Sequence, residues 1–162
     1  IDFQKSKNNT DDEIKFTINI GIYSSALFEF FSPDSPEKKP SIEDCHWRMR
    51  LGFLLPNNKD LWWIIRKGQS LDSLASELMT YIENLAIPMM MEHISDEKLL
   101  NEWLSGKSPG LTDIQRLINL SSLLKIAKME NALHKIIKEL ESNSIGKPIE
   151  FMVKQHINSL ST

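Results

Sequence analysis

Cysteine is almost absent from this chain of 162 residues, which has a single one at position 45. One cysteine excludes an internal disulfide framework and suits a reducing compartment, so we expect a cytoplasmic protein. No apolar run reaches the about 18 residues that a membrane-spanning helix needs. The densest run, residues 85–91, is interrupted by Pro88, and residues 1–7 lack the apolar core of a signal peptide. We therefore expect no membrane partner.

A strong charge of one sign is also lacking. The net charge is −3, with ten basic and ten acidic residues in 1–67, and nine basic and twelve acidic residues in 68–162. Neither part has the basic patch of a typical nucleic-acid binder, so nucleic acid ranks last among the expected partners.

Motifs for catalysis and metal binding are missing as well. The sequence has no phosphate-binding glycine loop and no Gly-x-Ser-x-Gly, His-Glu-x-x-His or Cys-x-x-Cys motif. The histidines fall in separate predicted elements without ligand spacing: His46, His93, His134 and His156. We expect no metal and no cofactor, and the sequence favours a non-enzymatic role.

Strand patterns fill the first part of the chain. Apolar residues alternate with polar ones over 14–23, which is the clearest strand signal in the sequence. Further strands are expected at 1–7, 44–55 and 61–66, and residues 32–41 with their three prolines are expected to form a loop. Short turns between strands favour an antiparallel meander.

From residue 70 onward the apolar spacing changes to three and four, which predicts helices. The first is capped by Ser70 and kinked or split by Pro88. The next begins at Ser95, and Thr112 with Gln115 forms a capping box for another. Two more helices follow, one after a turn near 127–129 and one after Pro148.

These patterns predict an α+β fold, with an antiparallel meander sheet of about four strands followed by about five helices packed on one side. A C-terminal helical hairpin is expected over 112–142. We expect a single domain over 1–162, with its sheet part at 1–67 and its helical part at 68–162. Residues 1–4 resemble the middle of a strand. We therefore expect that N-terminal residues are missing and that a sheet edge is open for dimerisation or strand addition.

Several segments together resemble a known family. They are residues 3–6, the strand 16–23, Cys45-His46 with 50–54, Trp62-Trp63 and the hairpin 117–140. They are similar to a bacterial family known as domain of unknown function 4304, and the resemblance extends over most of the chain. Its members begin with a helix and a strand before the segment matching Phe3-Gln4, which fits a missing start. The resemblance implies a fold and supplies no activity, cofactor or site residue.

The strand at 44–55 carries the best candidate for a binding surface. Its apolar residues, including Cys45 and Trp47, alternate with polar and basic ones, so the two sets should occupy opposite faces. The candidate binding face consists of side chains from three predicted strands: His46, Arg48, Arg50, Asn19, Tyr23 and Arg66. Arginine forks match carboxylates and phosphates.

Two structural alternatives stay open for the candidate binding face. Its arginines could pair with Asp44 or Glu43 on a solvated sheet surface, or helices could cover it. Cys45 and His46 should point to opposite faces, which excludes a Cys–His nucleophile pair and favours Cys45 in the core.

Our leading functional hypothesis is a non-enzymatic bacterial protein–protein interaction module, similar in kind to immunity or accessory proteins. The alternative is a protein that binds or hydrolyses a small anion or nucleotide at the candidate binding face. Single-stranded nucleic-acid binding is the weaker alternative. The oligomeric state stays open.

Overall fold

The computed structural model describes residues 1–34 and 39–161. It confirms the α+β class: a four-stranded antiparallel sheet is followed by the helices α2 to α7. The strands are β1 (Asp2–Lys5), β2 (Glu13–Ile22), β3 (Trp47–Arg50) and β4 (Trp63–Arg66). No helix in the described ranges combines the length and the apolar character needed to cross a membrane.

Strand β2 is the centre of the sheet. Its alternating pattern buries Phe16, Ile18 and Ile20 on one face, as the sequence predicts. β1 pairs with one edge of β2. The other edge is shared, because β3 pairs with residues 19–22 and β4 with residues 13–16. In a simple meander β3 and β4 would pair with each other, and here both pair with β2 instead.

The strand expected at 44–55 is shorter than predicted. β3 ends at Arg50 and a 3₁₀ turn, η1 (Leu51–Leu54), follows. Gly52 lies against the returning chain so closely that a Cβ atom there would stand 2.5 Å from the Lys59 carbonyl oxygen. This close approach needs glycine and turns the chain away from strand geometry.

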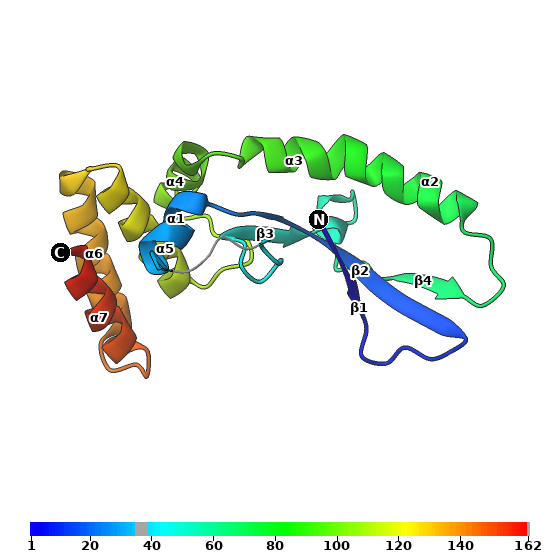
Figure 1. Ribbon diagram of the computed structural model, residues 1–162, viewed down its shortest axis with the longest axis horizontal. Helices are drawn as coiled ribbons and strands as arrows, with labels where there is room; N and C mark the ends of the chain where they lie inside the picture. Colours follow the sequence, from blue (N-terminus) through cyan, green and yellow to red (C-terminus); the bar gives the residue numbers. More distant parts are fainter. Residues whose placement is uncertain (35–38, 162) are drawn as a thin grey trace. The chain divides into compact units, whose positions relative to one another are not determined.

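A long helical segment covers the apolar face of the sheet (Figure 1). It consists of α2 (Asp72–Tyr81), a π-turn η2 (Ile82–Ala86) and α3 (Ile87–Glu92). Pro88 lacks an N–H group and cannot donate to the carbonyl of residue 84. The π-turn accommodates the missing hydrogen bond, so α2, η2 and α3 follow one another without a gap. The sequence predicts a kink or a split at Pro88. Leu71 occupies the N-cap position expected for Ser70, whose hydroxyl donates to Asp72 Oδ2 at 2.9 Å and accepts from Asp72 N at 3.4 Å.

The remaining helices are α1 (Ser25–Phe31), α4 (Asp96–Leu104), α5 (Asp113–Ile126), α6 (Glu130–Ser144) and α7 (Glu150–Leu160). Ser95 and Thr112 cap α4 and α5 as predicted, accepting hydrogen bonds from Lys98 N and Gln115 N. α1 was not predicted, although Ser24 caps it through the Leu27 N–H.

The described residues fall into two compact units. Unit 1 contains residues 1–23 and 39–94, with the sheet, α2 and α3. Unit 2 contains residues 24–34 and 95–161, with α1 and α4 to α7. That the two units form one domain stays a prediction.

Candidate functional site

The polar face of the sheet brings together five of the six residues of the candidate binding face. Asn19 lies opposite Arg50, and Gly21 lies opposite Arg48 in the neighbouring rung. One rung further, the rings of Tyr23 and His46 are 5.5 Å apart. The cross-strand register therefore collects these side chains on one surface.

Arg50 is neutralised within this surface. It forms an ion pair with Asp60, whose Oδ2 also accepts a hydrogen bond from Trp62 Nε1 at 3.3 Å. The Arg50 guanidinium lies 5.3 Å from the centre of the Trp62 ring, and Lys15 Nζ lies 5.6 Å from it. This arrangement satisfies the guanidinium with an acid and an aromatic face of the same chain.

Arg66 is separate from the other residues of the candidate binding face. It pairs across the strands with Glu13, and their side chains form an ion pair at 3.4 Å. Glu13 and Asn19 are six residues apart on β2, which corresponds to roughly 20 Å of strand. The reason is topological: β3 and β4 pair with different halves of β2.

The segment before β3 folds over the same polar face. Asp44 Oδ2 accepts hydrogen bonds from Ser41 N at 2.9 Å and from Ser41 Oγ at 2.8 Å. A Cβ atom on Gly21 would stand 2.8 Å from Cys45 Sγ, so this face of the sheet is closed at Gly21.

Cys45 therefore does not lie on the Trp47 face of the strand. The chain still turns at this point, with Cys45 N donating to the Ile42 carbonyl at 3.3 Å, so strand alternation starts only after it. Burial raises the pKa of the Cys45 thiol, which keeps it protonated and a poor nucleophile.

The apolar side of unit 1 contains an open groove of about 310 Å³. Its walls include Phe3, Ile14 and Phe16 from the sheet and Leu71, Leu74 and Leu78 from α2 and the residue before it. Phe3 is 55% exposed and Leu71 48% exposed, so large apolar side chains form the rim. We call this feature the unit 1 groove. The unit 1 groove was not predicted, although the alternation around Ile14 and the helical spacing of Leu71 and Leu74 place these apolar residues on the faces that form it.

Lys5 is the one charged side chain among the described residues that line the unit 1 groove. The walls otherwise offer no polar group for orienting a reactive small molecule. An apolar, concave surface of this kind binds through burial of apolar area.

Unit 2 contains a serine–histidine contact between α5 and α7. Ser121 Oγ lies 2.8 Å from His156 Nε2 and donates its hydrogen to the Ile118 carbonyl at 2.9 Å. Burial lowers the pKa of His156, which favours the neutral ring beside Ser121. Ser121 is 0% exposed. A fully buried hydroxyl that already donates to a carbonyl is a structural group and not a nucleophile.

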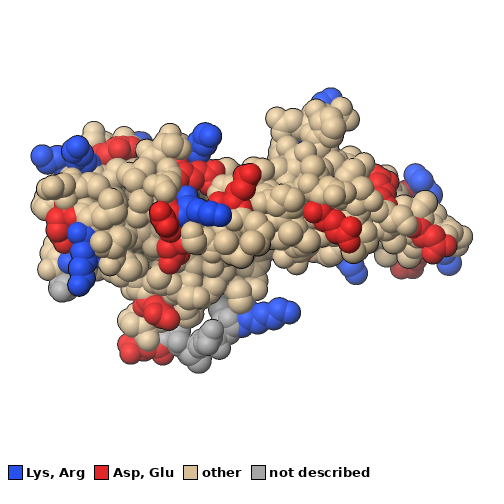
Figure 2. All heavy atoms as spheres, turned by 90° about the horizontal axis from the view of Figure 1, so that it is seen from above, with Lys and Arg blue, Asp and Glu red and all other residues tan. Residues whose placement is uncertain are grey.

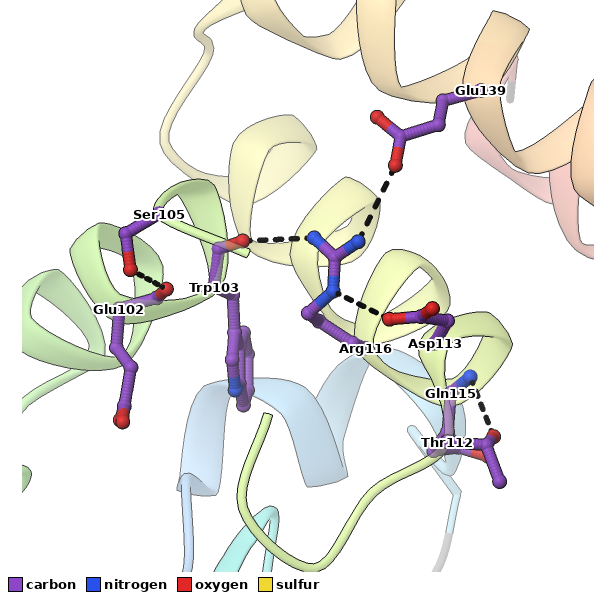
Figure 3. Close-up of polar contacts among 8 residues, drawn as sticks. All are labelled: Glu102, Trp103, Ser105, Thr112, Asp113, Gln115, Arg116 and Glu139. Atoms are coloured by element: carbon purple, nitrogen blue, oxygen red, sulfur yellow. Dashed lines mark hydrogen bonds and ion pairs between the residues drawn. The ribbon is translucent and has the colours of Figure 1, made fainter. Parts of the chain in front are cut away.

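A second polar centre in unit 2 surrounds Arg116 (Figure 3). Its guanidinium donates to the Trp103 carbonyl at 2.8 Å, to Glu139 Oε1 at 3.3 Å and to Asp113 Oδ1 at 3.4 Å. These partners belong to α4, α6 and α5. The charge of Arg116 is therefore used to join three helices.

Metal ligands do not assemble in the part of the chain that the structure describes, where no group of three or more His, Cys, Asp or Glu side chains could hold an ion. The four histidines lie in different segments of the fold, as their spacing in the sequence predicts.

Comparison with known families gives one result. The model of a family described as domain of unknown function (DUF4304) matches residues 1–92. The match includes nearly all of unit 1 and ends before α4, so the hairpin at 117–140 lies outside it. Comparisons with curated proteins and with solved structures gave no significant match. The matched segment covers more than half of the chain, which therefore belongs to the DUF4304 family.

Proposed function

We propose that this chain is a non-enzymatic protein-binding module and that the unit 1 groove receives an apolar segment of its partner. The observation that carries the proposal is the groove itself, with its apolar walls and the exposed rim residues Phe3 and Leu71. Exposed apolar surface of this kind is costly in water and marks binding sites. One unpaired cysteine suits a reducing compartment, so we place the module in the cytoplasm.

The titratable groups that could serve catalysis support a non-enzymatic role. The Cys45 thiol has a raised pKa, and His156 is paired with a serine that is closed to solvent. A nucleophile needs both solvent access and an activating neighbour. Neither the Cys45 thiol nor the Ser121 hydroxyl combines the two.

Small-anion binding at the candidate binding face ranks second. Arg50 and Arg66 each face a carboxylate of the same chain, which weakens their attraction for an incoming anion. The same compensation argues against a nucleic-acid interface, which depends on uncompensated positive charge.

The test compares two variants on one helix, expressed as tagged proteins in the native host. Leu74→Glu places a carboxylate in the wall of the unit 1 groove, and Ser76→Glu places the same charge on an exposed position two residues away. A carboxylate loses hydration when an apolar segment covers it, so Leu74→Glu should reduce capture of the partner by at least about tenfold.

Affinity purification with mass spectrometry is the measurement, and circular dichroism checks that both variants are folded. Wild type and Ser76→Glu should capture the same protein in stoichiometric amounts. The proposal fails if wild type captures no stoichiometric partner, or if Leu74→Glu captures it as well as wild type does.

A further inference from the structure

The outward side of the long helical segment exposes a row of large apolar side chains. Met79 on α2 is 52% exposed, and Ile87 and Met91 on α3 are 44% and 53% exposed. None of the three lines the unit 1 groove, although Met79 follows the groove residue Ala75 by one helical turn. Together with Glu83, which stands between them in sequence, these residues form what we call the outer row.

The π-turn η2 aligns the outer row. Met79, Glu83, Ile87 and Met91 follow one another at intervals of four residues. In an α-helix with 3.6 residues per turn, each such step would drift by about 40° around the axis. A π-turn closes its hydrogen bond one residue later, and here Ile87 N donates to the Ile82 carbonyl. The extra residue offsets the drift and keeps Ile87 and Met91 in line with Met79.

The long helical segment itself carries charged side chains of one sign only. The sequence has no Lys or Arg between Lys67 and Lys98. In the same stretch the long helical segment carries four acidic residues: Asp72, Glu77, Glu83 and Glu92. None of these carboxylates forms an ion pair with a basic side chain of the described residues. Figure 2, seen from above, shows acidic side chains separated by uncharged surface over α2 and α3.

We infer that the outer row docks a basic amphipathic helix of a partner protein. Apolar side chains of such a helix would cover Met79, Ile87 and Met91, and its lysines or arginines would meet Glu83 and the flanking acids. Apolar helix faces commonly supply the contact area in helix-mediated recognition. Opposite charges around the contact select the partner and speed its association. This inference concerns residues that do not line the unit 1 groove, and it does not depend on the function proposed for that groove.

The experiment uses the full chain and a defined probe. The probe is a synthetic amphipathic helix built from leucine and lysine, and its counterpart built from leucine and glutamate is the control peptide. Fluorescence anisotropy measures their affinity at low salt and at increasing salt. The lysine peptide should bind saturably and weaken as salt screens the charges, and the glutamate peptide should not bind.

Matched variants locate the binding site. Glu83→Lys reverses a charge in the outer row, and Glu141→Lys makes the same change at an exposed position of α6 in unit 2. Glu83→Lys and Ile87→Lys should each weaken binding of the lysine peptide about tenfold, and Glu141→Lys should leave it unchanged. Leu74→Glu should also leave it unchanged, which separates this surface from the unit 1 groove.

Three results would overturn the inference. The first is that the lysine peptide does not bind wild type at low salt. The second is that Glu141→Lys weakens binding of the lysine peptide as much as Glu83→Lys does. The third is dimerisation of the free protein that Ile87→Lys abolishes, because the outer row would then contact a second copy of the chain. Circular dichroism confirms the fold of each variant before binding is measured.

Discussion

The buried side chains of unit 1 are nearly all apolar, and Thr17 is its one buried polar residue among those described. Unit 2 is different, because α5 alone buries Arg116, Asn119, Ser121 and Ser122. Among the described residues, unit 1 buries no charged side chain, and some of its charges form ion pairs such as Arg66–Glu13, whereas unit 2 buries the Arg116 side chain.

The two kinds of core should lose stability through different substitutions. Apolar contacts are non-directional, and the stability they give depends on how well side chains fill the core. The stability of unit 1 should therefore fall most when large buried side chains are removed. Buried hydrogen bonds depend on geometry and leave a costly unpaired group when one partner is removed. Unit 2 should therefore respond strongly to changes in its polar side chains.

Trp47→Ala should give the largest effect and tests the apolar half of this comparison. Trp47 is 0% exposed, and its ring stacks on His93 with a centroid separation of 4.4 Å. Removing it should lower the free energy of unfolding by about 4 kcal/mol, measured by urea denaturation. Trp47→Phe is the control and should lose much less, because it retains a ring on His93.

Amide hydrogen exchange in Trp47→Ala shows which helices and strands lose protection. Faster exchange confined to β2, β3 and α3 would mean that unit 1 opens separately. Equal acceleration in α5 and α6 would support the single domain expected from the sequence, since both units would then unfold together.

Arg116→Met tests the polar half, with an expected loss of about 3 kcal/mol in the free energy of unfolding. The substitution removes all three charged hydrogen bonds of the guanidinium and leaves the Trp103 carbonyl with the Gly106 N–H as its donor. Glu139→Gln removes only a half-exposed partner and should cost less than about 1 kcal/mol. A loss below about 1 kcal/mol for Arg116→Met would contradict the comparison, since apolar packing would then replace the network.

The smallest effect concerns pH and again unit 2. The pKa of His156 is lowered by burial from its ordinary value of 6.5, so the unfolded chain takes up a proton before the folded one does. The stability that the neutral ring contributes is present above pH 6.5 and decreases as the pH falls below that value. His156→Gln should flatten this part of the pH dependence in urea denaturation, and His134→Gln should retain it. An unchanged slope in His156→Gln would remove His156 as its cause.

Local patterns predicted the parts of the fold that depend on neighbouring residues. The alternation around Phe16, Ile18 and Ile20 identified β2 and its buried face, and Ser95 and Thr112 marked helix starts. These signals depend on residues that are close together in the sequence, so they can be recognised without knowing how distant segments pack.

The candidate site was predicted only in part because it depends on register. Tyr23 and His46 meet, but Arg66 lies at the other end of β2, since the pairing of β4 with residues 13–16 has no local signal. The contact of Ser121 with His156 likewise depends on the packing of α5 against α7. Interactions between distant segments are decided by packing, which periodicity does not encode.

The π-turn also has a consequence for how relatives of this chain should be aligned. A helix that contains one residue more than its α-helical equivalent behaves as a one-residue insertion within Ile82–Ala86. Deleting that residue would rotate everything after it by about 100° around the helix axis. His93 would then leave Trp47, and Met91 would leave the outer row. A one-residue gap in this segment of an alignment therefore marks homologues expected to lack both the stacking of His93 on Trp47 and the position of Met91 in the outer row.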